Sequence, residues 1–141
     1  MQHSTELIPL VDTLLANLEP RQPLPEDFIH ALHSFFPDSL ILAALDLIDR
    51  QCVIKNISPW GHIQFDVLGS TATYTVLVNL SVTPVSAYCT CPAFVFAVLI
   101  SQSHIMCKHI LAARLAQKLS LCIERPLTLD GMASLGVSRN S

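Results

Sequence analysis

The spacing of apolar residues predicts three helices in the first third of the chain. In residues 7–18 they recur every three or four positions, which is the period of an amphipathic helix. A second helix should begin at Pro25, because proline suits the first helical position. Asp38 or Ser39 could cap a third helix that ends near Arg50. The second and third helices are expected to bury Phe28, Leu32, Phe35, Phe36, Ile41, Ala44, Leu45 and Ile48.

After Arg50 the pattern changes to the two-residue alternation of β-strands. The first two strands are joined at "SPWGH", which predicts a hairpin. Strands are expected at residues 53–57, 63–67, 73–80 and 85–91, followed by helical segments at 92–100 and 107–119. These elements indicate an α+β fold, in which N-terminal helices precede a small antiparallel β-sheet and a final helix.

The length of 141 residues suits one compact unit with a real hydrophobic core. Within it we distinguish an N-terminal helical segment, 1–50, and a segment of strands and paired cysteines, 51–120. Residues 121–141 form a C-terminal tail. From Glu124 onward its structural signals are weak, and we expect it to be mobile.

The composition is unusually apolar, with 51% hydrophobic and 13% charged residues. The longest apolar run, residues 93–100, is far shorter than the roughly 20 residues of a membrane span. Because the N-terminus also lacks a secretory signal, we expect a soluble intracellular protein. A helix over this run would be apolar on every side and should be buried. We expect one of the two apolar helices, at 7–18 or at 92–100, to form an interface with a partner protein, and the helix at 7–18 is preferred. The alternative is that the two helices pack on each other and complete a monomeric core.

Two short pairs of residues carry the chemistry of the second half. Cys89 and Cys91 lie two residues apart on a predicted strand, so both sulfurs point to the same face. Cys107 should precede the final helix and His109 should lie in its first turn, where their side chains can converge. Three thiolates and one imidazole make a closed structural zinc site without a position for a catalytic water. The predicted ligands are therefore Cys89, Cys91, Cys107 and His109.

The other cysteines and histidines have no partner at ligand spacing. His104, in the loop before Cys107, is the only rival to His109. Cys52 and Cys122 are expected to pack as small apolar side chains. The remaining histidines, expected at the surface or in hydrogen bonds, are His3, His30, His33 and His62. A redox dithiol at the C-x-C pair is an alternative, but it gives the C-x-H pair no role.

At these residues the chain resembles SWIM zinc fingers. The shared pattern is C-x-C, fifteen intervening residues and C-x-H, and Ala112 extends it, so the motif covers residues 89–112. A broader similarity, over residues 43–117, is to the small SWIM-domain subunits of Shu complexes. It is carried by "ALDLIDRQ", "VLGS", "CPAFVFAVL" and "CKH". The resemblance implies one structural zinc ion held by the four predicted ligands.

The resemblance also implies a non-enzymatic nuclear protein of homologous recombination and DNA repair. Such subunits pair with a RecA-type recombinase paralogue and promote the assembly of recombinase filaments. Single-stranded DNA would be reached through the complex, and neither a membrane nor a small-molecule substrate is implied.

Two other functions stay open on the residues alone. A direct nucleic-acid-binding finger needs a basic surface, and Lys108, Arg114, Lys118 and Arg125 gather around the last helix. The net charge of −3 disfavours that role. A thiol-redox enzyme or zinc hydrolase needs a reactive thiol or an open metal position. We find no nucleophile elbow or phosphate-binding glycine loop to support an enzyme.

Overall fold

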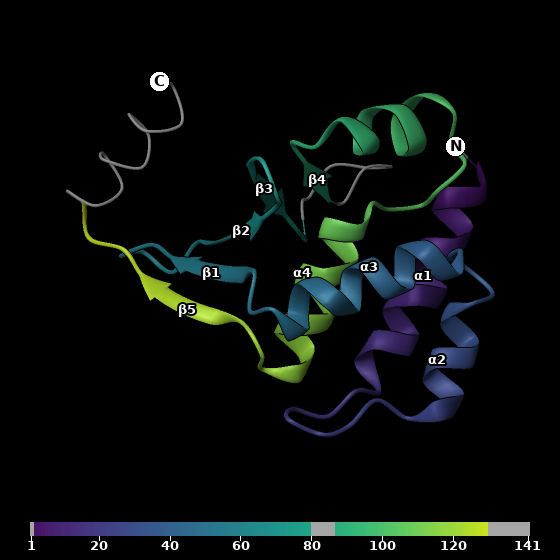
Figure 1. Ribbon diagram of the computed structural model, residues 1–141, viewed down its shortest axis with the longest axis horizontal. Coiled ribbons are helices and arrows are strands. Elements are labelled where there is room, and N and C mark those ends of the chain that lie inside the picture. Colours follow the sequence, from purple (N-terminus) through teal and green to yellow (C-terminus); the bar gives the residue numbers. More distant parts are fainter. Residues whose placement is uncertain (1, 80–86, 130–141) are drawn as a thin grey trace.

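A computed structural model describes residues 2–79 and 87–129 and confirms the α+β class (Figure 1). Its helices are α1 (Gln2–Ala16), α2 (Glu26–Leu32), α3 (Asp38–Asp49), the π-helix η1 (Phe94–Ile100) and α4 (Lys108–Leu119). Its strands are β1 (Val53–Ile57), β2 (Ile63–Leu68), β3 (Thr73–Leu77), β4 (Tyr88–Cys89) and β5 (Ile123–Pro126). Residues 85–86 of the predicted fourth strand, and residue 80 of the third, lie outside the described ranges.

Prolines stand at the N-termini of two helices. Pro25 and Pro37 are the N-caps of α2 and α3, and both have extended backbone conformations. The prediction that Asp38 or Ser39 caps α3 is therefore wrong, because Asp38 is already the first residue of that helix. The Asp38 carboxylate instead lies 2.5 Å from the imidazole of His33, across the turn between α2 and α3.

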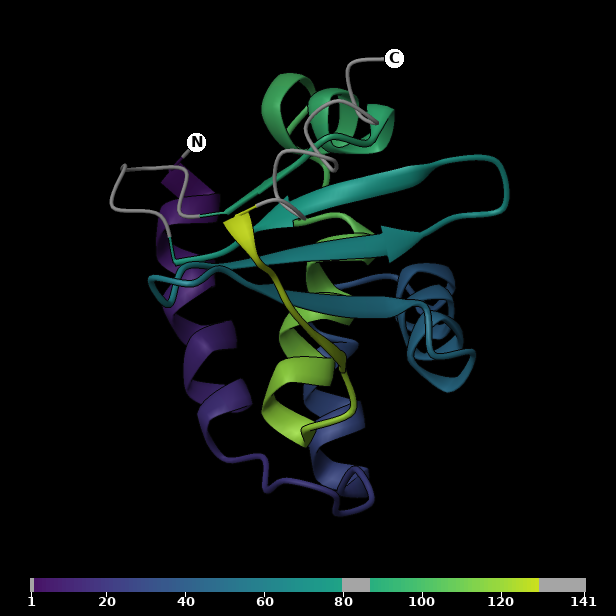
Figure 2. The ribbon, with the colours of Figure 1, turned by 90° about the vertical axis from the view of Figure 1, so that its left-hand side faces the viewer.

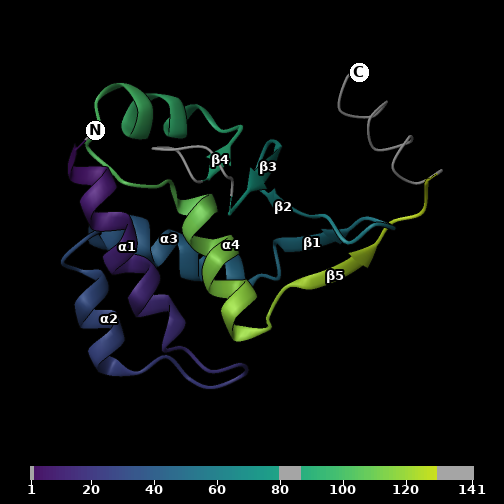
Figure 3. The ribbon, with the colours of Figure 1, turned by 180° about the vertical axis from the view of Figure 1, so that it is seen from behind.

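The five strands form one sheet in the order β4–β3–β2–β1–β5. The pairs β1–β2, β2–β3 and β3–β4 are antiparallel, as predicted, whereas β5 runs parallel to β1. The sheet is therefore mixed. After β4 the chain passes through α4 before it returns to the β1 edge as β5. Figures 1 and 3 show the helices α1 to α4 on one side of the sheet, and Figure 2 views the sheet from the other side.

The hydrophobic core fills the space between this sheet and the helices, with α4 at its centre. Leu111 and Leu115 of α4 are fully buried, as is Phe65 of β2. From α1, Val11 and Leu15 join the same core, and α1 lies against α4. The apolar face of α1, which we expected to receive a partner protein, thus packs largely within the molecule.

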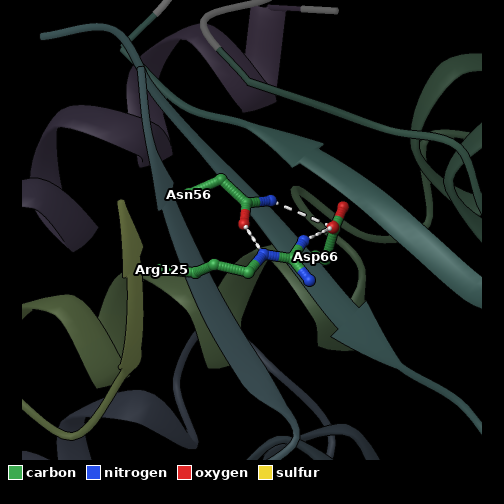
Figure 4. A network of polar contacts seen from close by, with 3 residues as sticks. All are labelled: Asn56, Asp66 and Arg125. Atoms are coloured by element: carbon green, nitrogen blue, oxygen red, sulfur yellow. Dashed lines mark hydrogen bonds and ion pairs between the residues drawn. The ribbon is translucent and has the colours of Figure 1, made fainter. Parts of the chain in front are cut away.

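The strand β5 is formed by residues of the predicted tail. Arg125 reaches across β1 from β5 and donates hydrogen bonds to Asn56 Oδ1 at 2.7 Å and Asp66 Oδ2 at 2.8 Å. Asn56 Nδ2 closes the triangle by donating to Asp66 Oδ2 at 2.9 Å (Figure 4). Asn56 and Asp66 are buried, so these bonds satisfy polar groups that water cannot reach. The expectation of a mobile tail from Glu124 is therefore wrong for 124–126; residues 130–141 lie outside the described ranges.

The π-helix η1 departs from its prediction. A helical turn does begin at Pro92, but of the η1 side chains only Phe94 is buried. Phe96 and Ile100 are 64% and 65% exposed, so this helix is not buried within the chain. Of the two expectations for it, packing in the core is wrong, and a partner-facing surface stays a prediction. A short helix at one end of the molecule has neighbours on one side only, and its opposite side meets solvent. None of the helices in the described ranges is long and apolar enough to cross a membrane.

Candidate metal centre

The fold brings the four predicted ligands together at the end of the sheet where β4 meets α4. Cys89 ends β4, and the alternation of the extended chain continues past it, with Thr90 exposed and Cys91 buried. Cys107 is the N-cap of α4 and His109 lies in its first turn, as the spacing predicted. The segment between the two pairs, including η1, loops out and returns, so residues far apart along the chain converge.

The donor atoms of these four buried residues all lie within 4.8 Å of one another. Cys89 Sγ is 3.8 Å from His109 Nδ1, which identifies Nδ1 as the imidazole atom that faces the sulfurs. A tetrahedral zinc ion with bonds of about 2.0 to 2.3 Å holds its ligand atoms roughly 3.3 to 3.8 Å apart. The group therefore fits one zinc ion in number and chemistry, and its donor atoms converge to a spacing only slightly wider than the bound geometry requires.

Backbone N–H groups point at all three sulfurs of the site. The N–H of Phe94 donates to Cys91, that of Ile110 to Cys107 and that of Cys91 to Cys89, and each bond lowers the pKa of the receiving thiol. Hydrogen bonds with Cys107 and Cys89 bring the pKa of Cys91 far below its ordinary value. The same bonding raises the pKa of Cys89, with burial adding to the effect. Among the protein groups alone, Cys91 is thus the preferred thiolate.

An aromatic side chain that the motif did not single out completes the surroundings of the site. The ring of Tyr74 in β3 lies over the imidazole of His109, with the ring centroids 4.6 Å apart. Gly69 permits this position, because a Cβ there would lie 2.9 Å from Tyr74 Cε2 and 2.8 Å from the Ala72 carbonyl oxygen. The "VLGS" segment therefore has a physical role at the site. Sequence reasoning missed Tyr74, since a single tyrosine on a strand carries no distinctive signal.

The residues set aside on sequence do not join the cluster. His104, the rival ligand, lies in the loop after η1, where its backbone N–H donates to the Ala97 carbonyl at 3.1 Å. Cys52 and Cys122 are free and half-buried. Burial raises the pKa of the Cys122 thiol to about 11. The side chain of His3 lies outside the described residues.

The four cations expected around the last helix do not form a continuous basic surface. Arg114 pairs with Asp12 of α1, and Arg125 is engaged with Asp66. Lys108 and Lys118 are exposed near opposite ends of α4. Two of the four charges are therefore matched within the molecule, which weakens the case for direct binding to phosphates.

Comparison with known proteins places the chain in a class. A family model described as SWIM zinc finger matches residues 74–118. The match begins at Tyr74 and includes all four candidate ligands. The molecule is therefore a SWIM zinc-finger protein with a buried Cys₃His group that could bind a single zinc ion.

The relatives define the family more narrowly. The chain is 37% identical over 114 residues to zinc finger SWIM domain-containing protein 7 of Homo sapiens, which covers 80% of this chain and 76% of the human protein. The Danio rerio protein of the same name is 36% identical over 136 residues, covering 93% of this chain and 92% of the fish protein. The chain belongs to the family of zinc finger SWIM domain-containing protein 7. No solved structure matches it significantly.

Proposed function

We propose that this chain is a non-enzymatic, zinc-bound subunit of a Shu-type complex. In this role it pairs with a RecA-type recombinase paralogue in the nucleus and promotes recombinase filament assembly during homologous recombination and DNA repair. The proposal rests on the family membership, through the resemblance to Shu-complex subunits, and on the chemistry of the metal site.

One observation carries the non-enzymatic part of the proposal. All four candidate ligands are buried and their donor atoms converge within 4.8 Å, so a tetrahedral zinc would have every position filled by protein. A zinc with four protein ligands has no place for a water or substrate. The ion would then act in folding, by joining β4 to the N-terminus of α4.

The charges favour contact with DNA through the partner. The net charge is −3, and Arg114 and Arg125 are matched by carboxylates of the same chain. A chain that binds phosphates by itself needs several free cations on one face. In this proposal, single-stranded DNA therefore binds to the assembled complex and not to this chain alone.

Thiol labelling separates this function from a thiol-redox enzyme. With zinc bound, Cys89, Cys91 and Cys107 should react with iodoacetamide at least about tenfold more slowly than after chelation, because coordinated sulfurs are poor nucleophiles. Mass spectrometry of the labelled peptides reads each site. Rapid labelling of Cys89 or Cys91 in the zinc-loaded protein, with turnover of a disulfide substrate, would favour the redox enzyme.

Co-expression with the recombinase paralogue of the same organism tests the subunit role. The two chains should co-purify as a stable complex, and loss of this chain from cells should lower recombination in a repair reporter. A fluorescent fusion should concentrate in the nucleus. If the two co-expressed chains purify separately and do not bind each other, the proposal is contradicted.

A further inference from the structure

The π-helix η1 presents three large apolar side chains on one face. In a π-helix the backbone bonds run five residues apart, so residues four and five apart lie close together on the helix surface. Ile100 therefore lies beside both Val95 and Phe96. Their exposures are 38% for Val95, 64% for Phe96 and 65% for Ile100. We call these three side chains the finger face.

The helix that carries the finger face is held firmly on its other side. Phe94 is buried, and its ring meets that of Tyr88 edge-on, with centroids 5.4 Å apart. Two backbone bonds tie the helix to the loop that follows it: the N–H of Ser101 donates to the Phe96 carbonyl at 2.9 Å, and that of His104 donates to the Ala97 carbonyl at 3.1 Å. The finger face is thus a pre-ordered surface, and binding to it costs little conformational entropy.

The segment that carries the finger face has no Asp, Glu, Lys or Arg, and this restricts what could cover it. No aspartate, glutamate, lysine or arginine occurs between Asp66 and Lys108. Nucleic acid is disfavoured because its phosphates need nearby cations. A membrane surface is disfavoured as well, since helices that lie on membranes surround their apolar face with lysine and arginine. An uncharged apolar protein surface is complementary to this region, because neither side would bury an unmatched charge.

The finger face also has the composition of an interaction hot spot. Aromatic side chains are enriched at the centres of protein interfaces, where water is excluded around them. Phe96 is the most prominent aromatic side chain of η1. Leu10 of α1 is exposed as well, but its neighbours Val11 and Leu15 are buried in the core, so the part of α1 whose side chains are described, from Leu7 onward, offers no comparable cluster.

We infer that the finger face docks into an uncharged apolar patch on the partner protein. This inference rests on the proposed function, in which the partner is a RecA-type recombinase paralogue. The zinc site lies directly beside η1, since Cys91 precedes the helix and the N–H of Phe94 donates to the Cys91 carbonyl at 3.2 Å. Zinc therefore orders the base of the docking helix, and loss of the metal should weaken pairing even though no ligand touches the partner.

A matched pair of double variants tests the docking surface. Phe96→Ser with Ile100→Ser removes the finger face, and Leu42→Ser with Trp60→Ser removes two side chains of similar exposure, 66% and 65%, elsewhere on the molecule. Each is co-expressed with the paralogue, and affinity is measured by titration of the purified chains. The finger-face variant should bind at least about tenfold more weakly, whereas the control should stay within about twofold of wild type.

Two further measurements keep the test decisive. Zinc content and thermal unfolding of each variant show whether it has folded. Hydrogen exchange of the wild-type chain, with and without the paralogue, should show new protection at 94–101, and this readout needs no substitution. Equal binding by both variants, or no new protection at 94–101, would overturn the docking surface while leaving the subunit role intact.

Other outcomes separate the docking surface from its alternatives. A wild-type chain that does not pair with the paralogue overturns the proposed function and this inference together. A wild-type homodimer in light scattering that the Phe96→Ser, Ile100→Ser variant dissociates would assign the finger face to a second copy of the chain. Binding of single-stranded oligonucleotide that this variant abolishes would assign it to nucleic acid.

Discussion

The two edges of the sheet are fastened by different chemistry. At one edge, β4 is joined to α4 by the three cysteines and the histidine of the metal centre. At the other edge, β5 is joined to β1 and β2 by Arg125, Asn56 and Asp66. Both clusters connect segments that are distant along the chain, and both are largely shielded from water. The first needs an ion from solution, whereas the second is complete within the chain.

This difference predicts different responses to damage. A zinc site is cooperative, because removal of one ligand weakens the hold on the metal for all four groups. A network of hydrogen bonds loses its stabilisation one bond at a time. Substitutions in the metal centre should therefore cause an all-or-none loss of stability, whereas substitutions in the Arg125 network should cause a graded loss.

The largest effect is expected from loss of the metal. Cys107→Ser should abolish stoichiometric zinc binding and unfold the region from β4 to α4, since structural zinc contributes about 10 to 16 kcal/mol in isolated zinc-finger peptides. Cys89→Ser, Cys91→Ser and His109→Ala should behave alike. Elemental analysis and circular dichroism measure the two effects. A folded Cys107→Ser protein with full zinc occupancy would exclude Cys107 as a ligand.

An intermediate effect is expected at the opposite edge. Arg125→Met removes the donors to Asn56 and Asp66, and should lower the free energy of unfolding by about 1 to 3 kcal/mol, the usual cost of a buried group that loses its partner. The backbone amides of β5 should exchange faster, while zinc content should not change. Urea unfolding and hydrogen exchange provide the measurements.

Two variants serve as controls for the Arg125 network. Arg125→Lys keeps the charge but loses the planar arrangement of donors, so its loss of stability should be intermediate. Glu124→Gln changes the adjacent exposed residue and should have little effect. If Arg125→Met is as stable as wild type, the network does not fasten β5.

The smallest effect is expected from the two cysteines outside the metal centre. Cys52→Ser and Cys122→Ser should each leave zinc content unchanged and cost less than about 1 kcal/mol, because both side chains are half-buried and neither joins the cluster. The pKa of about 11 also predicts slow alkylation of Cys122 near neutral pH. Loss of zinc in either variant would reopen the choice of ligands.

The metal centre could be predicted because its chemistry follows from short-range spacing. Two cysteines on an extended segment, and a cysteine and histidine at a helix start, are pairs whose local geometry is fixed by the backbone. Only the meeting of the two pairs depends on the tertiary fold. It could be expected, because three cysteines and one histidine are a usual ligand set for zinc. The structure places the pairs as that reasoning required.

The strand β5 could not be predicted in the same way. Residues 123–126 contain two charged residues and a proline, so neither alternation nor composition marks a strand. Its position depends on a buried carboxylate elsewhere in the sheet. The one available signal was Asp66 within the apolar strand "IQFDVL", because a buried charge there requires a cationic partner.

The sequence left open whether η1 packs in the core or faces a partner, for a different reason. An apolar helix is expected to be buried only if the domain has enough surface to cover it, and a sequence pattern does not reveal how many neighbours a helix will have. The core is already filled by α1 to α4 against the sheet, and η1 adds to it only one buried side chain, Phe94, with Val98 and Leu99 partly buried against it.

The parallel pairing of β5 with β1 also has a consequence for protein synthesis. Asn56 and Arg125 are separated by 69 positions. At translation rates of about 5 to 20 residues per second, β5 is therefore synthesised roughly 3 to 14 seconds after β1. During that interval one edge of β1 is open, and an open strand edge can pair with another nascent chain. Chaperones that shield strand edges should therefore matter most late in translation. A premature stop before Ile123 would leave that edge permanently open and make the truncated product prone to aggregation.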